Sequence, residues 1–133
     1  MTGTVYETIY NKLEKLGVLD VKEYKKLTSD GYMDLNIDYI RKTKDGYILA
    51  IAHNYTQNGD VMADPDMEIK IHPDMKMAEA LTYQQDPGTY QRVYEEKNGK
   101  TYVNPQLKKD LNTFLNQWCT NLLKQGFEPI QEE

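Results

Sequence analysis

The chain of 133 residues contains one cysteine, two histidines, two phenylalanines and no long apolar run. A single cysteine, Cys119, excludes an internal disulfide framework and is typical of a reducing compartment. No segment approaches the roughly 18 consecutive apolar residues of a membrane span, and the first residues lack the charged-then-apolar pattern of a secretion signal. We therefore expect a cytoplasmic protein without membrane contact.

The chain also lacks an excess of basic residues. Lysine and arginine number 16 against 21 acidic residues, which gives a net charge of −5. Proteins that bind the phosphate backbone of nucleic acids show a basic face, so direct nucleic-acid binding is not expected. The balance permits the opposite, an acidic surface that meets a basic partner. Because phosphate-loop, dinucleotide-loop, nucleophile-elbow and C-x-x-C motifs are missing as well, we predict no cofactor.

The sequence does contain 11 tyrosines and one strong hairpin signal. Tyrosine favours half-buried interface positions, although β-propensity alone also places it on the solvated face of a sheet. Asn58-Gly59 separates two β-rich runs, 47–57 and 60–71, and predicts a two-residue type I′ loop. Alternating apolar residues predict another strand over 33–39. Further turn signals divide the chain up to residue 95 into about five strands, including single runs over 75–85 and 90–95.

Helix signals flank this region. Thr4, with a glutamate three residues later, predicts a capped helix over 4–16. Asn104, followed by a proline at the first helical position, predicts a helix over 105–125 with a broad apolar stripe. A weaker pattern predicts a second short helix over 20–27.

Together these elements predict one α+β domain over residues 1–133. Its antiparallel meander of about five strands, from about residue 31 to 95, would carry the N-terminal and C-terminal helices on a single face. We expect Trp118, in the apolar stripe of the C-terminal helix, to be buried in the core. Small residues on adjacent strands would let that helix approach closely: Ala50, Ala52, Ala78 and Ala80.

An acidic cluster beside a histidine is the one candidate for chemistry. Counting back from the Asn-Gly loop puts His53 opposite Asp64, at the ~4.5–5.5 Å separation of cross-strand Cβ atoms. A metal-dependent enzyme acting on nucleic acid or nucleotide would use His53, Asp60, Asp64 and Asp66, of which His53, Asp64 and Asp66 are the candidate metal ligands. Pro65 speaks against regular pairing, because proline cannot donate to a ladder and indicates a bulge or an edge. A solvated strand face is the simpler interpretation.

Polar residues at a strand end offer contacts to a protein partner. Tyr83 and Gln85 stand beside a turn and present a hydroxyl and an amide, whereas His72 has no recognisable partner in the sequence. We predict no catalytic residue and expect a non-enzymatic binding module; a structural or oligomerisation domain is a further alternative, and the oligomeric state stays open. The candidate partner-binding residues are His53, Tyr55, Asp60, Asp64, Asp66, Tyr83 and Gln85.

Four segments carry a resemblance to a known family: Gly31-Tyr-Met-Asp-Leu35, the block from Gln57 to Ile69, Glu79-Ala-Leu-Thr-Tyr-Gln-Gln85, and Leu107 to Trp118. Over about residues 30 to 123 the chain resembles an uncharacterised family of small bacterial proteins. Its members are carried on conjugative plasmids, integrative elements and phages, alone or appended to antirestriction-type proteins. The resemblance implies a setting on mobile DNA and accessory or anti-defence roles by association. It implies no catalytic residue.

Overall fold

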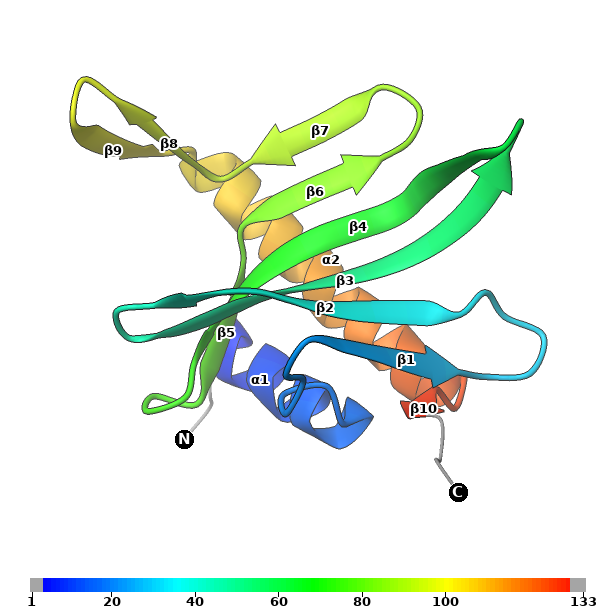
Figure 1. Cartoon of the computed structure of the whole chain (residues 1–133). Helices are drawn as coiled ribbons and strands as arrows, with labels where there is room; N and C mark the ends of the chain where they lie inside the picture. The colour runs from blue at the N-terminus through cyan, green and yellow to red at the C-terminus, as the bar shows by residue number, and fades with distance from the viewer. Residues whose placement is uncertain (1–3, 130–133) are drawn as a thin grey trace.

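The computed structural model describes residues 4–129, which fold as an antiparallel sheet with two helices on one of its faces (Figure 1). The predicted α+β class is confirmed. In Figure 1 the viewer looks onto the face that carries no helix, and the long C-terminal helix crosses behind the strands. Within the described range, neither helix is long and apolar enough to cross a membrane.

The two predicted helices form with the predicted caps. Helix α1 spans Val5–Leu16, and a capping box at Thr4 begins it. Helix α2 spans Pro105–Lys124, and the side chain of Asn104 accepts a hydrogen bond from the backbone at its start. Both caps satisfy N–H groups that have no partner inside the helix.

The structure contains ten strands in its described part, about twice the predicted number. Eight form the main sheet in the order β10-β1-β2-β3-β4-β6-β7, with β5 paired to β4 outside this path, while β8 and β9 form a separate hairpin. The bounds are β1 Tyr24–Thr28, β2 Leu35–Thr43, β3 Gly46–Gln57, β4 Asp60–His72, β5 Met77–Ala80, β6 Thr82–Gln85, β7 Thr89–Arg92, β8 Tyr94–Lys97, β9 Lys100–Val103 and β10 Glu128–Pro129.

The central hairpin is confirmed. Strands β3 and β4 pair from Gln57 with Asp60, and the loop residues Asn58 and Gly59 have φ angles of 53° and 86°. Two consecutive positive φ angles define the type I′ loop that matches the twist of the flanking strands.

The predicted helix over 20–27 is wrong, because part of this segment is strand β1. Leu27 pairs with Leu35 of β2 and is fully buried, and the Tyr24 hydroxyl donates to the side chain of Asn36. Strand β1, which lies between β10 and β2, buries Leu27 in the core, and this tertiary gain overrides a weak helical pattern.

Two runs that read as single strands are each divided. The run 75–85 separates into β5 and β6 at Leu81, whose backbone N–H donates to Glu68 O at 2.8 Å. The run 90–95 separates into β7 and β8 at Val93, whose N–H donates to Leu81 O at 2.9 Å. Each break bends the chain while the backbone groups remain paired.

Alternation along β2, β3 and β4 separates two faces of the sheet. Ile51 and Met67 pair with each other and join the core cluster beneath the helices, on what we name the helix face. Asn36, Ala52 and Asp66 form the neighbouring cross-strand row, on what we name the open face. Successive side chains of a strand point to opposite sides, so each strand supplies both faces.

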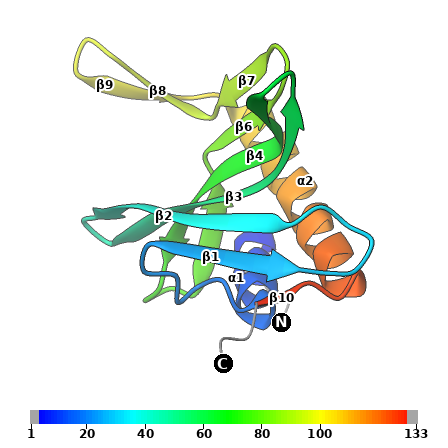
Figure 2. The same cartoon turned by 45° about the vertical axis from the view of Figure 1, so that its right-hand side comes forward.

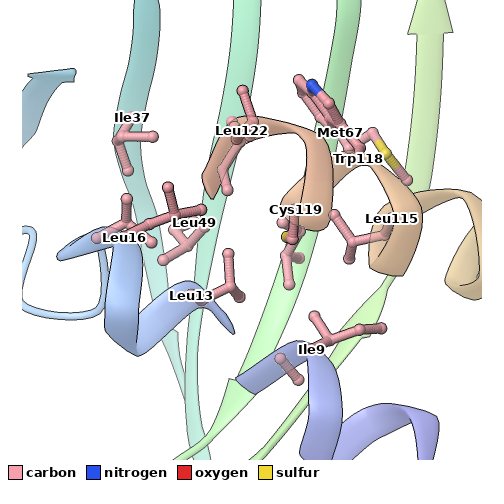
Figure 3. Close-up of a cluster of buried hydrophobic side chains, with 14 of the residues drawn as sticks. Ile9, Leu13, Leu16, Ile37, Leu49, Met67, Leu115, Trp118, Cys119 and Leu122 are labelled. Atoms are coloured by element: carbon pink, nitrogen blue, oxygen red, sulfur yellow. The ribbon is translucent and has the colours of Figure 1, made fainter. Parts of the chain in front are cut away.

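The core lies between the helix face and the two helices (Figure 3). Trp118 is buried there with 7% of its surface exposed, beside the fully buried Cys119. Among the small residues, Ala78 and Ala80 belong to this core as predicted. The expectation is wrong for Ala50 and Ala52, which alternate onto the open face away from α2.

Candidate functional site

A β-bulge decides where the predicted acidic residues point. Ala52 pairs with Asp66 and Asn54 with Ala63, so two residues of β4, Asp64 and Pro65, stand opposite His53 alone. The predicted regular pairing of His53 with Asp64 is therefore wrong, and the bulge anticipated from Pro65 is present. An inserted residue resets the alternation, which leaves Asp66 on the open face and Asp64 on the helix side.

His53 is held in aromatic packing on the helix side. Its ring centroid lies 5.7 Å from Trp118 and 5.6 Å from Phe127, and its Nδ1 lies 3.1 Å from Asp34 O. The ring thus contacts α2 and the chain after it. Asp60 stands exposed at the tip of the β3–β4 hairpin. Across residues 4–129, no three His, Cys, Asp or Glu side chains gather as metal ligands would.

Four further residues predicted to bind a partner lie around the C-terminal end of β6 and contact one another or the backbone there: Tyr55, Asp64, Tyr83 and Gln85. The Gln85 amide donates to Asp64 Oδ1, and the Tyr83 hydroxyl donates to Gln85 Oε1 at 3.1 Å. Tyr55 OH lies 3.4 Å from its acceptor, Asp86 O. The ring of Tyr83 also meets Phe114 edge-on at 5.4 Å. These contacts tie the group together as one half-buried surface beside α2.

The open face concentrates carboxylates over a floor of small residues. Asp38 and Glu68 stand on either side of Ala50, and Asp66 lies in the next row beside Ala52. Burial raises the pKa of Asp66 to about 6, and repulsion from nearby carboxylates, Glu68 foremost, adds to the shift. A positive charge placed next to these carboxylates would stabilise the ionised form of Asp66 and would therefore bind favourably there.

Two adjoining hollows mark where the open face is concave. One encloses about 280 Å³ between β7 and the β8–β9 hairpin, and the other about 530 Å³ nearer the β2–β3 turn. Figure 2 shows the β8–β9 hairpin and the β2–β3 turn reaching out on the same side of the sheet, away from α2. Volumes of this size accommodate a few side chains of a ligand. We name the two hollows together the groove; its lining residues are Arg41, Thr43, Ile48, Glu68, Lys70, Glu79, Leu81, Thr82, Tyr90, Arg92, Tyr94, Glu96 and Thr101.

Glu79 and Tyr94, which line the larger hollow, belong to one hydrogen-bonded group of side chains with His72. His72 Nε2 lies 3.0 Å from Glu79 Oε2, and Tyr94 OH donates to Glu79 Oε1 at 2.8 Å. His72 thus has a partner that its sequence neighbourhood did not reveal, because Glu79 reaches it from the neighbouring strand β5. In the same hollow the hydroxyl of Thr43 is buried without a hydrogen-bond partner among the described residues.

Sequence reasoning identified one residue of the open face, Asp66, and missed the groove. Arg41 and Arg92 line the smaller hollow from β2 and β7, which lie far apart in the chain. One signal was readable: of the 16 basic residues in the sequence, only these two are arginines.

Comparison with protein families gives one match. A family model described as Domain of unknown function (DUF6908) matches residues 5–128, nearly the whole described chain. No curated protein and no solved structure matches the chain.

Proposed function

Since the chain belongs to this family of unknown function, we propose its function from the geometry: a non-enzymatic module that binds a basic segment of a protein partner on the open face of its sheet. The proposal needs no metal or cofactor. The partner's lysine or arginine side chains would lie over Asp38, Asp66 and Glu68, and the rest of the segment would follow the groove.

The charge state of the open face is the observation that carries the proposal. Within the described residues, no lysine or arginine lies within ion-pair distance of Asp38, Asp66 or Glu68. Asp66 is half-buried and keeps a pKa of about 6, so ionising it next to two other carboxylates costs free energy. A cation supplied by a partner would relieve this repulsion, because the attraction acts at a partly desolvated surface.

The other groups on the same face suit a polypeptide. Gln84 and Tyr90 face each other across β6 and β7 beside Asp66. Amides and phenols bind peptide groups and pack on side chains, and tyrosine is enriched at protein interfaces. A net charge of −5 makes a phosphate backbone a poor ligand.

The metal-dependent enzyme is not supported by an observation of its own. Its four residues lie in different places: His53 packs on Trp118, Asp60 stands at a hairpin tip, and Asp64 and Asp66 are on opposite sides of the sheet. The alternative makes a distinct prediction, because millimolar Mg²⁺ or Mn²⁺ would raise the melting temperature and Asp64→Asn would abolish the rise.

The biological setting is a second part of the proposal. The resemblance noted in the sequence supports a cytoplasmic accessory of a conjugative element or phage, acting in conjugation or against a host defence by protein binding. Deleting the gene from a carrier element should lower transfer into a restricting host. Wild type should restore transfer, whereas the Asp66→Asn/Glu68→Gln double variant should not.

Peptide binding tests the molecular part. The probe is a fluorescent, amidated peptide of alternating lysine and threonine, and the readout is fluorescence anisotropy at low salt. We expect wild type to bind it and the Asp66→Asn/Glu68→Gln variant to bind about tenfold or more weakly, since each lost charge contact is worth roughly 1 kcal/mol.

A matched control removes two carboxylates elsewhere. Glu14→Gln/Asp110→Asn changes the net charge equally, and both residues are exposed on the helices. This variant should bind like wild type. Equal binding by both double variants would mean that only the net charge of the protein attracts the peptide, and would overturn the open face as the site. Light scattering separates the oligomerisation alternative, which expects a stable dimer at micromolar concentration.

A further inference from the structure

We propose that Arg41 and Arg92 form a carboxylate-binding subsite in the smaller hollow, so that the bound segment carries an aspartate or glutamate side chain next to its basic residues. The inference rests on the proposed function, because it concerns the same face, and it adds the chemical class of a second recognised group. It makes the ligand a segment of mixed charge rather than a purely basic one.

The choice of arginine is the first observation. All other basic residues of the chain are lysines, yet both arginines line this one hollow of about 280 Å³. A guanidinium presents its N–H groups as a rigid planar fork that matches the two oxygens of a carboxylate, whereas a lysine ammonium is a point charge. Two forks on one hollow are suited to a planar oxyanion.

A bulge in β2 directs Arg41 to this position. Tyr39 pairs with Leu49 and Arg41 with Ile48, so Ile40 is an extra residue in the strand. In a regularly paired strand, Ile40 would oppose Ile48 and Arg41 would share the helix face with Tyr39. With the extra residue, Arg41 stands beside Ile48 on the open face, where both line the groove.

Arg92 reaches the hollow from the opposite wall. It pairs with Thr82 across β6 and β7, and its guanidinium carbon lies 5.6 Å from the ring centroid of Tyr90. A cation over an aromatic face is held in a narrower range of orientations. The side chain is thus partly oriented before a ligand arrives.

Both guanidinium groups are available to a ligand. No carboxylate of residues 4–129 lies within ion-pair distance of Arg41 or Arg92. Thr82 supplies a further donor, because its oxygen already accepts a hydrogen bond from Glu68 N at 3.1 Å while its O–H donates to no described group. Two guanidinium groups and one hydroxyl therefore line the same hollow, and none of them donates a side-chain hydrogen bond to a described residue.

Acidic residues in the same hollow decide which anion fits. Glu68 and Glu96 line it together with the two arginines, so the four charges sum to zero before a ligand binds. A carboxylate with one negative charge meets less repulsion there than a doubly charged phosphate. Because the two hollows share lining residues and adjoin, a segment can run through both. We therefore assign the carboxylate to a side chain rather than to a chain end.

The test uses the two arginines as reporters. A ¹⁵N spectrum of the protein resolves the arginine Nε–Hε pairs, and this chain has only two. The probes are acetylated, amidated peptides of alternating lysine and threonine with one central residue, either glutamate or glutamine. We expect the glutamate peptide to shift both Nε–Hε signals and to bind about tenfold more tightly than the glutamine peptide.

Charge-conserving variants isolate the fork geometry. Arg41→Lys and Arg92→Lys should each remove most of the preference for glutamate while leaving binding of the glutamine peptide within about twofold. Unchanged melting curves show that the variants are folded. Equal affinity of wild type for the two peptides, or a preference that survives in both lysine variants, would overturn the subsite.

Two further comparisons distinguish a side-chain carboxylate from a chain end, and failure of the subsite from failure of the proposed function. A glutamine peptide with a free C-terminal carboxylate that binds like the glutamate peptide would overturn the assignment to a side chain. If wild type binds neither peptide, the proposed function fails first, and the subsite that rests on it fails with it. If both peptides bind equally and Asp66→Asn/Glu68→Gln weakens both, only the subsite fails.

Discussion

The two faces of the main sheet are built from the same strands and have opposite properties. The helix face buries a continuous apolar cluster under α1 and α2 (Figure 3). The open face carries Asp38, Asp66 and Glu68 over two alanines and leads into a polar groove. Alternation assigns successive residues to the two faces, so one strand supplies the core and the binding surface at once.

This difference teaches that stability and recognition are carried by different sets of side chains. Burial of apolar area supplies most of the folding free energy, and that burial is concentrated on the helix face. Asp38, Asp66 and Glu68 on the open face have no ion-pair partner among the described residues, so we expect them to contribute little to stability or to oppose it. Substitutions should therefore fall into two groups, which the following predictions test from the largest expected effect to the smallest.

Truncating the core tryptophan should have the largest effect. Trp118→Ala removes a ring that contacts Phe114 and His53 from α2, and should lower the free energy of unfolding by about 3–5 kcal/mol. Urea denaturation measures this. Tyr102→Ala is the control, because its ring is 52% exposed on β9. A loss below about 1 kcal/mol for Trp118→Ala would contradict the core placement.

Removing the buried amide between α2 and β5 should come next. Asn112 is the one polar residue of the described chain that is buried as a whole, and its Oδ1 accepts from Ala80 N at 2.9 Å. Asn112→Ala leaves that N–H buried without a partner and should cost about 1–3 kcal/mol. The exposed Asn121, changed to alanine, serves as control and should cost less than about 0.5 kcal/mol. Similar losses for the two variants would contradict the role of Asn112.

Neutralising the open face should stabilise the protein. The pKa of Asp66 is raised from its ordinary 3.8 to about 6, so the folded state binds more protons than the unfolded state between these values. The contribution of Asp66 to the stability of wild type should therefore fall as pH rises from about 4 to 6. Asp66→Asn should remove this fall and gain about 1 kcal/mol at pH 7 and above, after allowance for solvent screening of a partly exposed group. Melts across pH measure it, and a loss of stability at pH 8 would contradict the prediction.

The arginines should affect stability least. Arg41→Lys and Arg92→Lys keep the charge and disturb no ion pair of the described residues, so each should change the free energy of unfolding by less than about 0.5 kcal/mol. Chemical denaturation checks this. A large loss in either variant would make that arginine a structural residue. It would contradict the assignment of stability to the helix face and of recognition to the open face.

The elements that sequence could predict are those specified locally. Asn58-Gly59 encodes its loop through backbone conformation, and the caps at Thr4 and Asn104 satisfy neighbouring N–H groups. These signals depend only on residues close in the chain. Strand β1 escaped prediction because Leu27 becomes a strand residue only when it pairs with Leu35.

The candidate site depends on features that sequence does not display. The extra residue Ile40 has no turn or proline signal, yet it directs Arg41 to the open face. The bulge at Pro65 was foreseeable, but its effect on Asp66 required the register on both sides. Glu79 meets His72 only because β5 pairs with β4. A shift of one residue exchanges the faces, so small errors in register change the entire site.

The β8–β9 hairpin joins the main sheet through few backbone contacts. Val93 N–H donates to Leu81 O, Asn104 N–H donates to Val93 O, and the hairpin strands are largely exposed. The hairpin forms one wall of the groove, and few backbone hydrogen bonds connect this wall to the rest of the fold. Changes in the length or the residues of its loop should therefore alter the groove while the core between the sheet and the helices stays intact.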